Sequence, residues 1–340
     1  MGAAGQVQVT PERILQLGWG FAPPMMIGAA VHHRVFDILD RGPKDVETVA
    51  GLAGASVRGM RALMNALAGI GLLSKNGSGE FGLTTESATF LVSSKPKYLG
   101  AMLSHVCSDL MPRWAQLADL VRTGKPSAGV NQERTGTEFF GGFVDALFPM
   151  NYPAAEALAQ ALRVAEAKST VKVLDLAAGS GVWGIALAQK SPLVKVTAVD
   201  FPGVLKVTRR MVAHHRLADR FSYLAGDLAS ADFGGGYNIA TLGHILHSEG
   251  EARSRALLKK TQAALAPGGT IAIAEFLVEG DRSGPPMGLM FAVNMLVATE
   301  EGDTFSFREI SAWLREAGFE EPRTVDAPGP SPLILANKPS

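Results

Sequence analysis

The stretch that decides the fold runs from Val171 to Asp200 and reads VKVLDLAAGSGVWGIALAQKSPLVKVTAVD. An apolar run over 171–176 has the length of a buried strand, small residues follow it, and 182–190 has a helical pattern. A second apolar run over 194–199 ends at Asp200. Strand, glycine-rich turn, helix and strand form a right-handed crossover, whose ligand lies beyond the carboxyl ends of the strands. The sequence therefore predicts an α/β fold built on a nucleotide-binding parallel sheet.

The glycine-rich turn fits two patterns. Gly179-Ser180-Gly181-Val182-Trp183-Gly184 is a literal G-x-G-x-x-G, the dinucleotide fingerprint. Read from the strand end, residues 175–181 spell D-x-A-x-G-x-G, which resembles the first motif of class I S-adenosylmethionine-dependent methyltransferases, with Ala177 where the first glycine usually stands. Asp175 separates the two patterns, because a carboxylate just before the glycines repels a pyrophosphate and suits a cationic amino acid ligand. The methyltransferase interpretation is therefore favoured.

Acidic residues follow three of the predicted strands. Asp175 is the first, and Asp200 can accept hydrogen bonds from a ribose diol. Gly226-Asp227-Leu228 follows a strand predicted over 221–224 and places an acid near an adenine amine, with an apolar neighbour against the ring. Aspartate is also common in turns after strands, but three such acids are more specific than one. We predict cofactor contacts from Asp175, Ala177, Gly179, Gly181, Asp200, Phe201, Gly226, Asp227 and Leu228.

A histidine follows the next strand, predicted over 237–242. His247 comes at the same edge of the sheet as the acids, and His244 is its rival, predicted to turn inward along the strand. A phenol with a pKa of about 10 is only about 0.1% ionised at pH 7, which withholds roughly 4 kcal/mol of nucleophile. A neutral imidazole within reach can remove that proton, whereas an aliphatic hydroxyl is far too weak an acid. We therefore predict a phenolic methyl acceptor with His247 as the base.

Composition sets the outer bounds. At 340 residues the chain predicts two domains, and equal numbers of basic and acidic residues, 32 each, predict no field that attracts nucleic acid or an acidic membrane. The single cysteine, Cys107, suits a reducing compartment. The seven histidines show no metal-ligand spacing, and the sequence predicts neither a signal peptide nor a membrane span. We expect a cytoplasmic protein, and a hydrophobic fraction of 47% indicates a large contact between subunits.

Residues 1–98 predict a winged-helix-like domain. Helices over 45–53 and 56–73 precede two short strands within 72–84, which is a helix-helix-hairpin pattern. Only Arg58 and Arg61 lie on the recognition helix, too few for DNA binding by a neutral chain, so we expect a dimerisation domain.

The remainder divides into two predicted parts. Residues 99–165 form a helical linker over the site, with one long helix kinked at Pro112, and residues 166–340 form the cofactor-binding domain. Aromatic and methionine side chains in the linker, and on a helix over 287–298, could equally be core or pocket wall. We predict substrate contacts from His105, Met111, Trp114, Phe143, Met150, Phe291, Asn294 and Met295.

The motifs together resemble small-molecule O-methyltransferases of the caffeate and acetylserotonin type. The resemblance covers about residues 10–338 and rests on the glycine-rich turn, Val199-Asp200-Phe201-Pro202, Gly226-Asp227-Leu228, Ile245-Leu246-His247 and Ala274-Glu275. It implies a Rossmann-like seven-stranded sheet, S-adenosyl-L-methionine as cofactor and a homodimer formed through the N-terminal domain. It also implies His247 as general base, with Glu275 orienting it.

Three positions depart from the family pattern. The second carboxylate of the family falls at Thr304, beside Asp303, the acid after the histidine is Ser248, and the lysine near the adenine falls at Gly243. The departures leave an alternative open, namely a cofactor-binding relative that performs C-, N- or S-methylation, another reaction or a regulatory role.

Overall fold

The computed structural model describes residues 9–126, 144–329 and 331–340. The chain divides into two compact units, Met1–Met111 and Pro112–Ser340. The segment predicted as a helical linker, 99–165, is therefore shared between the two units, each of which is described here by itself.

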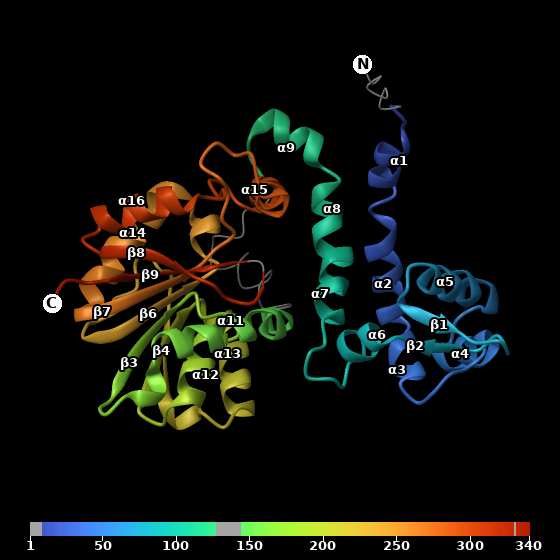
Figure 1. Cartoon of the computed structure of the whole chain (residues 1–340), viewed down its shortest axis with the longest axis horizontal. Helices are drawn as coiled ribbons and strands as arrows, with labels where there is room; N and C mark the ends of the chain where they lie inside the picture. The colour runs from blue at the N-terminus through green and yellow to red at the C-terminus, as the bar shows by residue number, and fades with distance from the viewer. Residues whose placement is uncertain (1–8, 127–143, 330) are drawn as a thin grey trace, which may run out of the picture. The chain divides into compact units, whose positions relative to one another are not determined.

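The first unit consists of helices and one small hairpin (Figure 1). Its helices are α1 (Glu12–Gly18), α2 (Ala22–His32), α3 (Val35–Leu39), α4 (Val46–Ala53), α5 (Val57–Gly69), α6 (Thr85–Phe90) and α7 (Gly100–His105), followed by the π-helix η1 (Val106–Leu110). Strands β1 (Leu73–Lys75) and β2 (Phe81–Leu83) pair antiparallel after α4 and α5. The predicted helix-helix-hairpin order is therefore present.

Local chemistry explains where these helices begin. Asp45 and Ser56 cap α4 and α5, since their side chains accept hydrogen bonds from the backbone N–H groups of Thr48 (2.7 Å) and Gly59 (3.1 Å). Helices α2 and α3 are separated at Arg34, which adopts a left-handed conformation with φ 56°.

The second unit is built on a seven-stranded sheet with the order β5-β4-β3-β6-β7-β9-β8. The strands are β3 (Val171–Leu176), β4 (Val194–Asp200), β5 (Phe221–Ala225), β6 (Tyr237–Gly243), β7 (Leu265–Ala274), β8 (Glu320–Val325) and β9 (Leu333–Asn337). The first five are parallel, and β9 pairs antiparallel with both β7 and β8. The seven-stranded methyltransferase sheet that the resemblance implied is thus confirmed.

Helices cover both faces of this sheet (Figure 1). On one face lie α11 (Phe148–Ala161), α12 (Val182–Lys190) and α13 (Pro202–His214), and on the other lie α14 (Leu246–Ala264) and α16 (Phe307–Glu316). Alternation along β3 sends Val173 into the core beneath α11 and α12, and sends Leu174 and Leu176 into the core beneath α14 and α16. The same alternation directs Asp175 toward α12, which matters for the site.

The remaining elements of this unit are short or lie beyond the sheet. They are α8 (Met111–Trp114), which crosses the unit boundary, α9 (Leu117–Thr123), α15 (Pro286–Ala298) and the 3-10 turns η2 (Val144–Leu147), η3 (Val164–Glu166) and η4 (Ala218–Arg220). The predicted long helix continues through α7, η1 and α8 with helical backbone, is irregular at the π-helical turn η1 directly before Met111 and Pro112, and is interrupted after Trp114. Helix α11 begins at Phe148, with Pro149 in its first turn.

Candidate active site

A pocket lies where the parallel strands β3, β4, β5 and β6 end. Its wall is formed by the segments that follow these four strands together with parts of η2, α11, α12, α13 and α14. The lining residues are Val144, Leu147, Asn151, Ala177, Ala178, Gly179, Ser180, Val182, Trp183, Asp200, Phe201, Val204, Gly226, Asp227, Leu228, Gly243, His244, Ile245, His247, Ser248, Glu249 and Arg253. Seven of the nine predicted cofactor residues are therefore brought together, the exceptions being Asp175 and Gly181.

Asp200 organises the glycine-rich turn. Its Oδ2 accepts a hydrogen bond from the backbone N–H of Gly179 (2.8 Å), and its Oδ1 accepts one from the N–H of Phe201 (2.7 Å). Burial raises the pKa of Asp200 to about 6, although these two N–H groups act in the opposite direction. Each carboxylate oxygen can accept a further hydrogen bond, which fits a vicinal diol at the end of β4.

Close packing explains the glycine in this turn. Gly179 has φ 56°, and a Cβ there would lie 2.9 Å from the Val144 side chain. A side chain at this position would thus be strained and would crowd the pocket, so only glycine lets a ligand approach the backbone.

Asp175 takes a different place from the one predicted. Its side chain is completely buried, and it accepts hydrogen bonds from Thr241 Oγ1 (2.6 Å) and from the Gly184 N–H (3.2 Å). Burial raises the pKa of Asp175 to about 7, more than the hydrogen bonds lower it. Because Asp175 points toward α12 and not into the pocket, it joins β3, β6 and α12, which corrects the expectation that it faces the ligand. Gly181 likewise caps α12 outside the pocket wall.

Asp227 lies at the far end of the pocket from β6. Its Oδ1 accepts a hydrogen bond from the Ala229 N–H (2.7 Å) and lies 3.6 Å from Nη2 of Arg253. Arg253 Nε in turn donates to Glu249 Oε2 (2.5 Å). Sequence reasoning missed Arg253 and Glu249, since nothing in the local pattern shows which residues of α14 face the loop after β5.

His247 and Glu275 form a buried pair. His247 Nδ1 lies 2.6 Å from Glu275 Oε2, and their side chains are 9% and 3% exposed. The other oxygen, Oε1, accepts hydrogen bonds from the N–H groups of Leu246 (2.7 Å) and His247 (3.3 Å). Burial would raise the pKa of Glu275, but the imidazole and the hydrogen bonds lower it below its ordinary value. Because a carboxylate can only accept, Nδ1 carries the proton in this contact, and Nε2 is the ring nitrogen left to act as an acceptor when the imidazole is neutral.

A glycine kink holds this pair in position. Helix α14 is broken at Gly250 (φ 74°, ψ 175°), so His247 sits on a separate first turn. A Cβ at Gly250 would collide with the carbonyl oxygen of Glu301, and the His247 carbonyl accepts a hydrogen bond from the Asp303 N–H (2.9 Å). The segment 299–304 therefore clasps the histidine turn.

His244 also reaches the pocket, although it was predicted to turn inward. It has φ 61°, and its Nε2 lies 2.9 Å from Ser331 Oγ. Burial, aided by the nearby His247, lowers the pKa of His244 to about 4, so this ring is neutral. Its role is that of a neutral, hydrogen-bonded wall residue.

Aromatic rings surround His247. Phe291 of α15 meets the imidazole edge to face, with ring centroids 4.9 Å apart, and Phe276 lies 4.1 Å from Phe291. Phe291 was predicted on the substrate side, and the structure brings it to the histidine. Phe276 was missed, although it directly follows Glu275 at the end of β7.

The other predicted substrate residues are only partly assembled. Trp114 Nε1 donates to Asn294 Oδ1 (3.0 Å), whereas Met295 is buried and Met150 half-buried on α11. His105 and Met111 belong to the first unit, and Phe143 lies outside the described residues. Their roles stay predictions.

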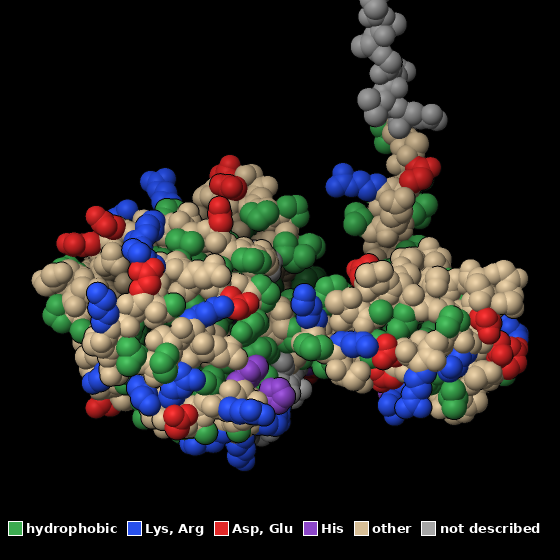
Figure 2. Space-filling view, turned by 60° about the horizontal axis from the view of Figure 1, so that its bottom comes forward, with side chains coloured by type: hydrophobic (Ala, Val, Ile, Leu, Met, Phe, Trp, Pro, Cys, Tyr) green, Lys and Arg blue, Asp and Glu red, His purple; other side chains and the backbone are tan. Residues whose placement is uncertain are grey.

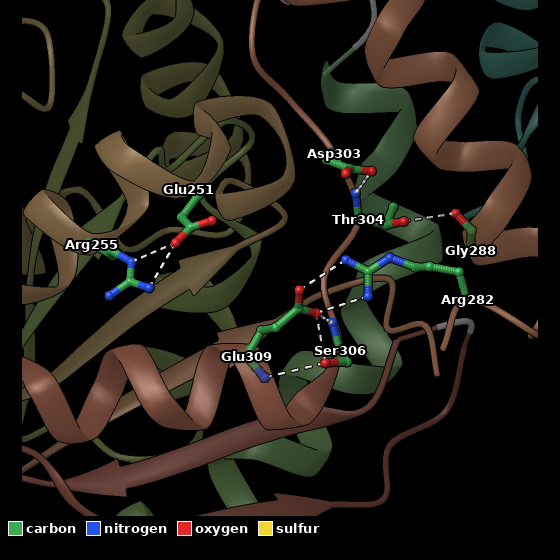
Figure 3. Close-up of polar contacts among 8 residues, drawn as sticks. All are labelled: Glu251, Arg255, Arg282, Gly288, Asp303, Thr304, Ser306 and Glu309. Carbon is green, nitrogen blue, oxygen red and sulfur yellow. Dashed lines mark hydrogen bonds and ion pairs between the residues drawn. The ribbon is translucent and has the colours of Figure 1, made fainter. Parts of the chain in front are cut away.

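Thr304 stands where the family has its second carboxylate, but here its side chain connects two segments through hydrogen bonds. It is fully buried, and its Oγ1 donates to the carbonyl oxygen of Gly288 in α15 (3.2 Å), while its N–H donates to Asp303 Oδ1 (2.7 Å) (Figure 3). Nearby, Arg282 makes two hydrogen bonds to Glu309 (3.0 and 2.9 Å), and Glu309 completes the capping box of Ser306 (Figure 3). These bonds fix α15 and α16 relative to the clasp on His247.

Comparisons with known proteins agree with this geometry. Residues 114–320 match the O-methyltransferase domain family, and residues 15–93 match the O-methyltransferase dimerisation domain. The chain is 29% identical to the tetracenomycin polyketide synthesis 8-O-methyl transferase TcmO of Streptomyces glaucescens, over 97% of each chain. It is also 29% identical to the 3-hydroxy-5-methyl-1-naphthoate 3-O-methyltransferase of Streptomyces sahachiroi, over 96% of this chain and 95% of that one.

A solved structure shows the same fold with the methyl donor present. Human N-acetylserotonin methyltransferase in complex with S-adenosylmethionine superposes with a TM-score of 0.86 at 25% identity, over the full length of both chains. The resemblance drawn from the sequence motifs is therefore confirmed. The chain belongs to the O-methyltransferase family and is an S-adenosylmethionine-dependent O-methyltransferase.

Proposed function

We propose that this enzyme methylates a phenolic hydroxyl of an aromatic small molecule, with His247 as general base and Glu275 as the residue that orients it. The observation that carries the proposal is the 2.6 Å contact between His247 Nδ1 and Glu275 Oε2 at the edge of the pocket. The contact occupies Nδ1, so Nε2 is the ring nitrogen that can take a proton from an ionisable hydroxyl when the imidazole is neutral.

The residues of the chain divide the work. S-adenosylmethionine supplies the methyl group, and the residues that would hold it are those around Gly179, Asp200 and Asp227. His247 Nε2 accepts the phenol proton as the oxygen becomes a nucleophile, and the Glu275 carboxylate stabilises the imidazolium that results. Most of the remaining contribution is alignment of acceptor and donor, which the fixed strand ends provide.

The rings near His247 support an aromatic acceptor. Phe291 and Phe276 form an aromatic wall beside the imidazole. Such a wall favours a flat ring through stacked and edge-to-face contacts. The relatives named for a naphthoate and for a tetracenomycin polyketide carry the same inference to fused-ring phenols.

The proposed function is tested with donor labelled in its methyl group. We expect label to pass to 1-naphthol or a hydroxynaphthoate, and not to the same compound with its hydroxyl already methylated. Transfer to the blocked compound would indicate C-methylation, and transfer only to amines or thiols would indicate a different acceptor atom. No transfer to any of them would contradict the proposal.

Glu275→Gln is expected to lower kcat by about 10²-fold with little change in KM for the acceptor, because the amide cannot stabilise the imidazolium. Glutamine keeps an oxygen for the Leu246 and His247 N–H groups, so the fold should persist. Steady-state kinetics measure the effect, and the exposed Glu279→Gln serves as the matched control.

The acidity of the acceptor separates catalysis from structural damage. A nitro-substituted phenol is already ionised near neutral pH, so the loss in Glu275→Gln should shrink toward unity for such an acceptor. An equal loss for weak and strong phenols would show that Glu275 acts only on the structure.

We also propose that the protein is a homodimer formed through the N-terminal unit. The segment that begins the described chain carries exposed apolar side chains (Figure 2), among them Ile14 (74% exposed), Leu17 (71%) and Trp19 (69%). By length and composition alone, the helical stretch Glu12–His32 could also cross a membrane. The match of residues 15–93 to a dimerisation domain favours a second copy as the cover, and with it a cytoplasmic location.

The double variant Ile14→Asp/Leu17→Asp is expected to shift the mass measured by light scattering from two chains to one. Two buried carboxylates would each need to be desolvated at the interface. Gln16→Asp, an exposed polar position on the same helix, is the matched control and should remain dimeric. A monomeric unaltered protein that binds lipid vesicles would contradict the proposal.

A further inference from the structure

We propose that the indole N–H of Trp183 binds the carboxylate of the amino acid part of S-adenosylmethionine. The inference deepens the proposed function, since it rests on the donor occupying this pocket. It assigns to Trp183 a role that the G-x-G-x-x-G pattern alone does not give it.

Trp183 and Gly243 fit into one another. Trp183 lies in the first turn of α12, is 4% exposed and lines the pocket together with Gly243 at the end of β6. A Cβ at Gly243 would overlap Nε1 of Trp183, with Cδ1 and Cε2 of the ring 2.6 Å away. The nitrogen-bearing edge of the indole therefore occupies the space that a side chain at position 243 would take.

The indole N–H of Trp183 has no hydrogen-bond acceptor among the described residues. Across residues 9–126, 144–329 and 331–340, no hydrogen bond to Trp183 Nε1 is formed, although most of the ring is buried. The neighbouring His244 ring lies 6.4 Å away, centroid to centroid, and is bonded to Ser331. An N–H donor at a pocket wall that has no acceptor among the described residues can donate to an acceptor that a ligand supplies.

The order of the strands in the sheet indicates which part of S-adenosylmethionine lies next to Trp183. Asp227 follows β5 and Asp200 follows β4, so the adenine and ribose lie on that side of β3. Gly243, at which the resemblance placed a lysine near the adenine, instead ends β6 on the other side of β3, so the amino acid end of the donor points toward Trp183. That end carries the one carboxylate of the molecule.

The described part of the pocket wall offers the carboxylate of the ligand mainly uncharged hydrogen-bond donors. Among the described lining residues, Arg253 is the one Lys or Arg side chain, and it lies with Glu249 and Asp227 at the adenine side. Within the described wall, the donors left for the carboxylate are therefore N–H and O–H groups, and Trp183 Nε1 is one of them that has no acceptor in the described structure.

The test replaces Trp183 with phenylalanine, which keeps an aromatic ring but lacks the N–H. Calorimetry compares S-adenosylmethionine with its decarboxylated form, a pair that differs only in the carboxylate. We expect Trp183→Phe to bind S-adenosylmethionine about 10-fold more weakly, as for loss of one hydrogen bond to a charged group, and the decarboxylated ligand within about 2-fold of the unaltered protein.

The controls separate this inference from the function on which it rests. Trp313→Phe removes a buried indole N–H from the opposite helical layer and should change neither affinity. Equal weakening for both ligands, or no weakening for either, would overturn the role of the N–H. Failure of the unaltered protein to bind S-adenosylmethionine would overturn the function itself, and a methylating enzyme with an unaffected Trp183→Phe variant would overturn the present inference alone.

Discussion

His247→Ala is expected to lower kcat by about 10²- to 10⁴-fold while the dissociation constant for S-adenosylmethionine stays within about 3-fold. The imidazole is the group placed to accept the phenol proton, and its Nδ1 is already committed to Glu275. Without it, at most about 0.1% of a phenol with a pKa near 10 is ionised at pH 7. Single-turnover kinetics and calorimetry measure the two quantities separately.

Rescue makes this result specific. Truncation to alanine leaves a space beside Phe291, so added imidazole should restore part of the turnover in a concentration-dependent way. His214→Ala, an exposed histidine on α13, is the control and should retain full activity. Unchanged turnover in His247→Ala would mean that proximity alone drives the reaction, as for an acceptor that needs no deprotonation.

Asp200→Ala is expected to weaken binding of S-adenosylhomocysteine by at least about 100-fold. The change removes the acceptors for the ribose hydroxyls and releases the Gly179 and Phe201 N–H groups that shape the turn, each charged hydrogen bond being worth about 1.5–3 kcal/mol. Calorimetry measures the dissociation constant, and Asp219→Ala, an exposed carboxylate, is the control. A change below about 3-fold would contradict the assignment of Asp200 to the ribose.

The pH dependence should run in opposite directions for binding and stability. The pKa of Asp200 is about 6 in the protein without ligand, so affinity should fall as the pH drops through 6 and the carboxylate is protonated. Asp175, with a pKa of about 7, and Asp200 both bind protons more tightly in the folded than in the unfolded chain. Their contribution to the unfolding free energy is therefore greatest below about pH 4 and is lost as the pH rises toward 7.

Much of the fold could be predicted because the spacing of apolar residues along the sequence indicates which side chains are buried. The runs that became β3 and β4 are mostly apolar, as expected of strands that are covered on both faces. Helix ends were less predictable. The break at Arg34 depends on a left-handed residue that is not glycine, and no local pattern announces it.

The sequence was sufficient to predict which residues follow the strand ends at the site. It was not sufficient to predict the direction in which their side chains point. Asp200 and His247 were placed correctly because parallel strands bring their carboxyl ends to one edge. Asp175 was not, because alternation along β3 turns it beneath α12, and the motif spacing does not distinguish a ligand from a support. Arg253 was missed because its position depends on the kink at Gly250.

The kink at Gly250 holds one set of contacts in the site together and leaves the exposed residues of α15 outside that set. His247, Glu275 and the clasp 299–304 depend on one another and on a glycine whose Cβ would collide with a carbonyl. The exposed residues of α15, Pro286, Met287 and Met290, have no part in those bonds. Substitutions at those exposed positions of α15 are therefore expected to leave the contact between His247 and Glu275 in place.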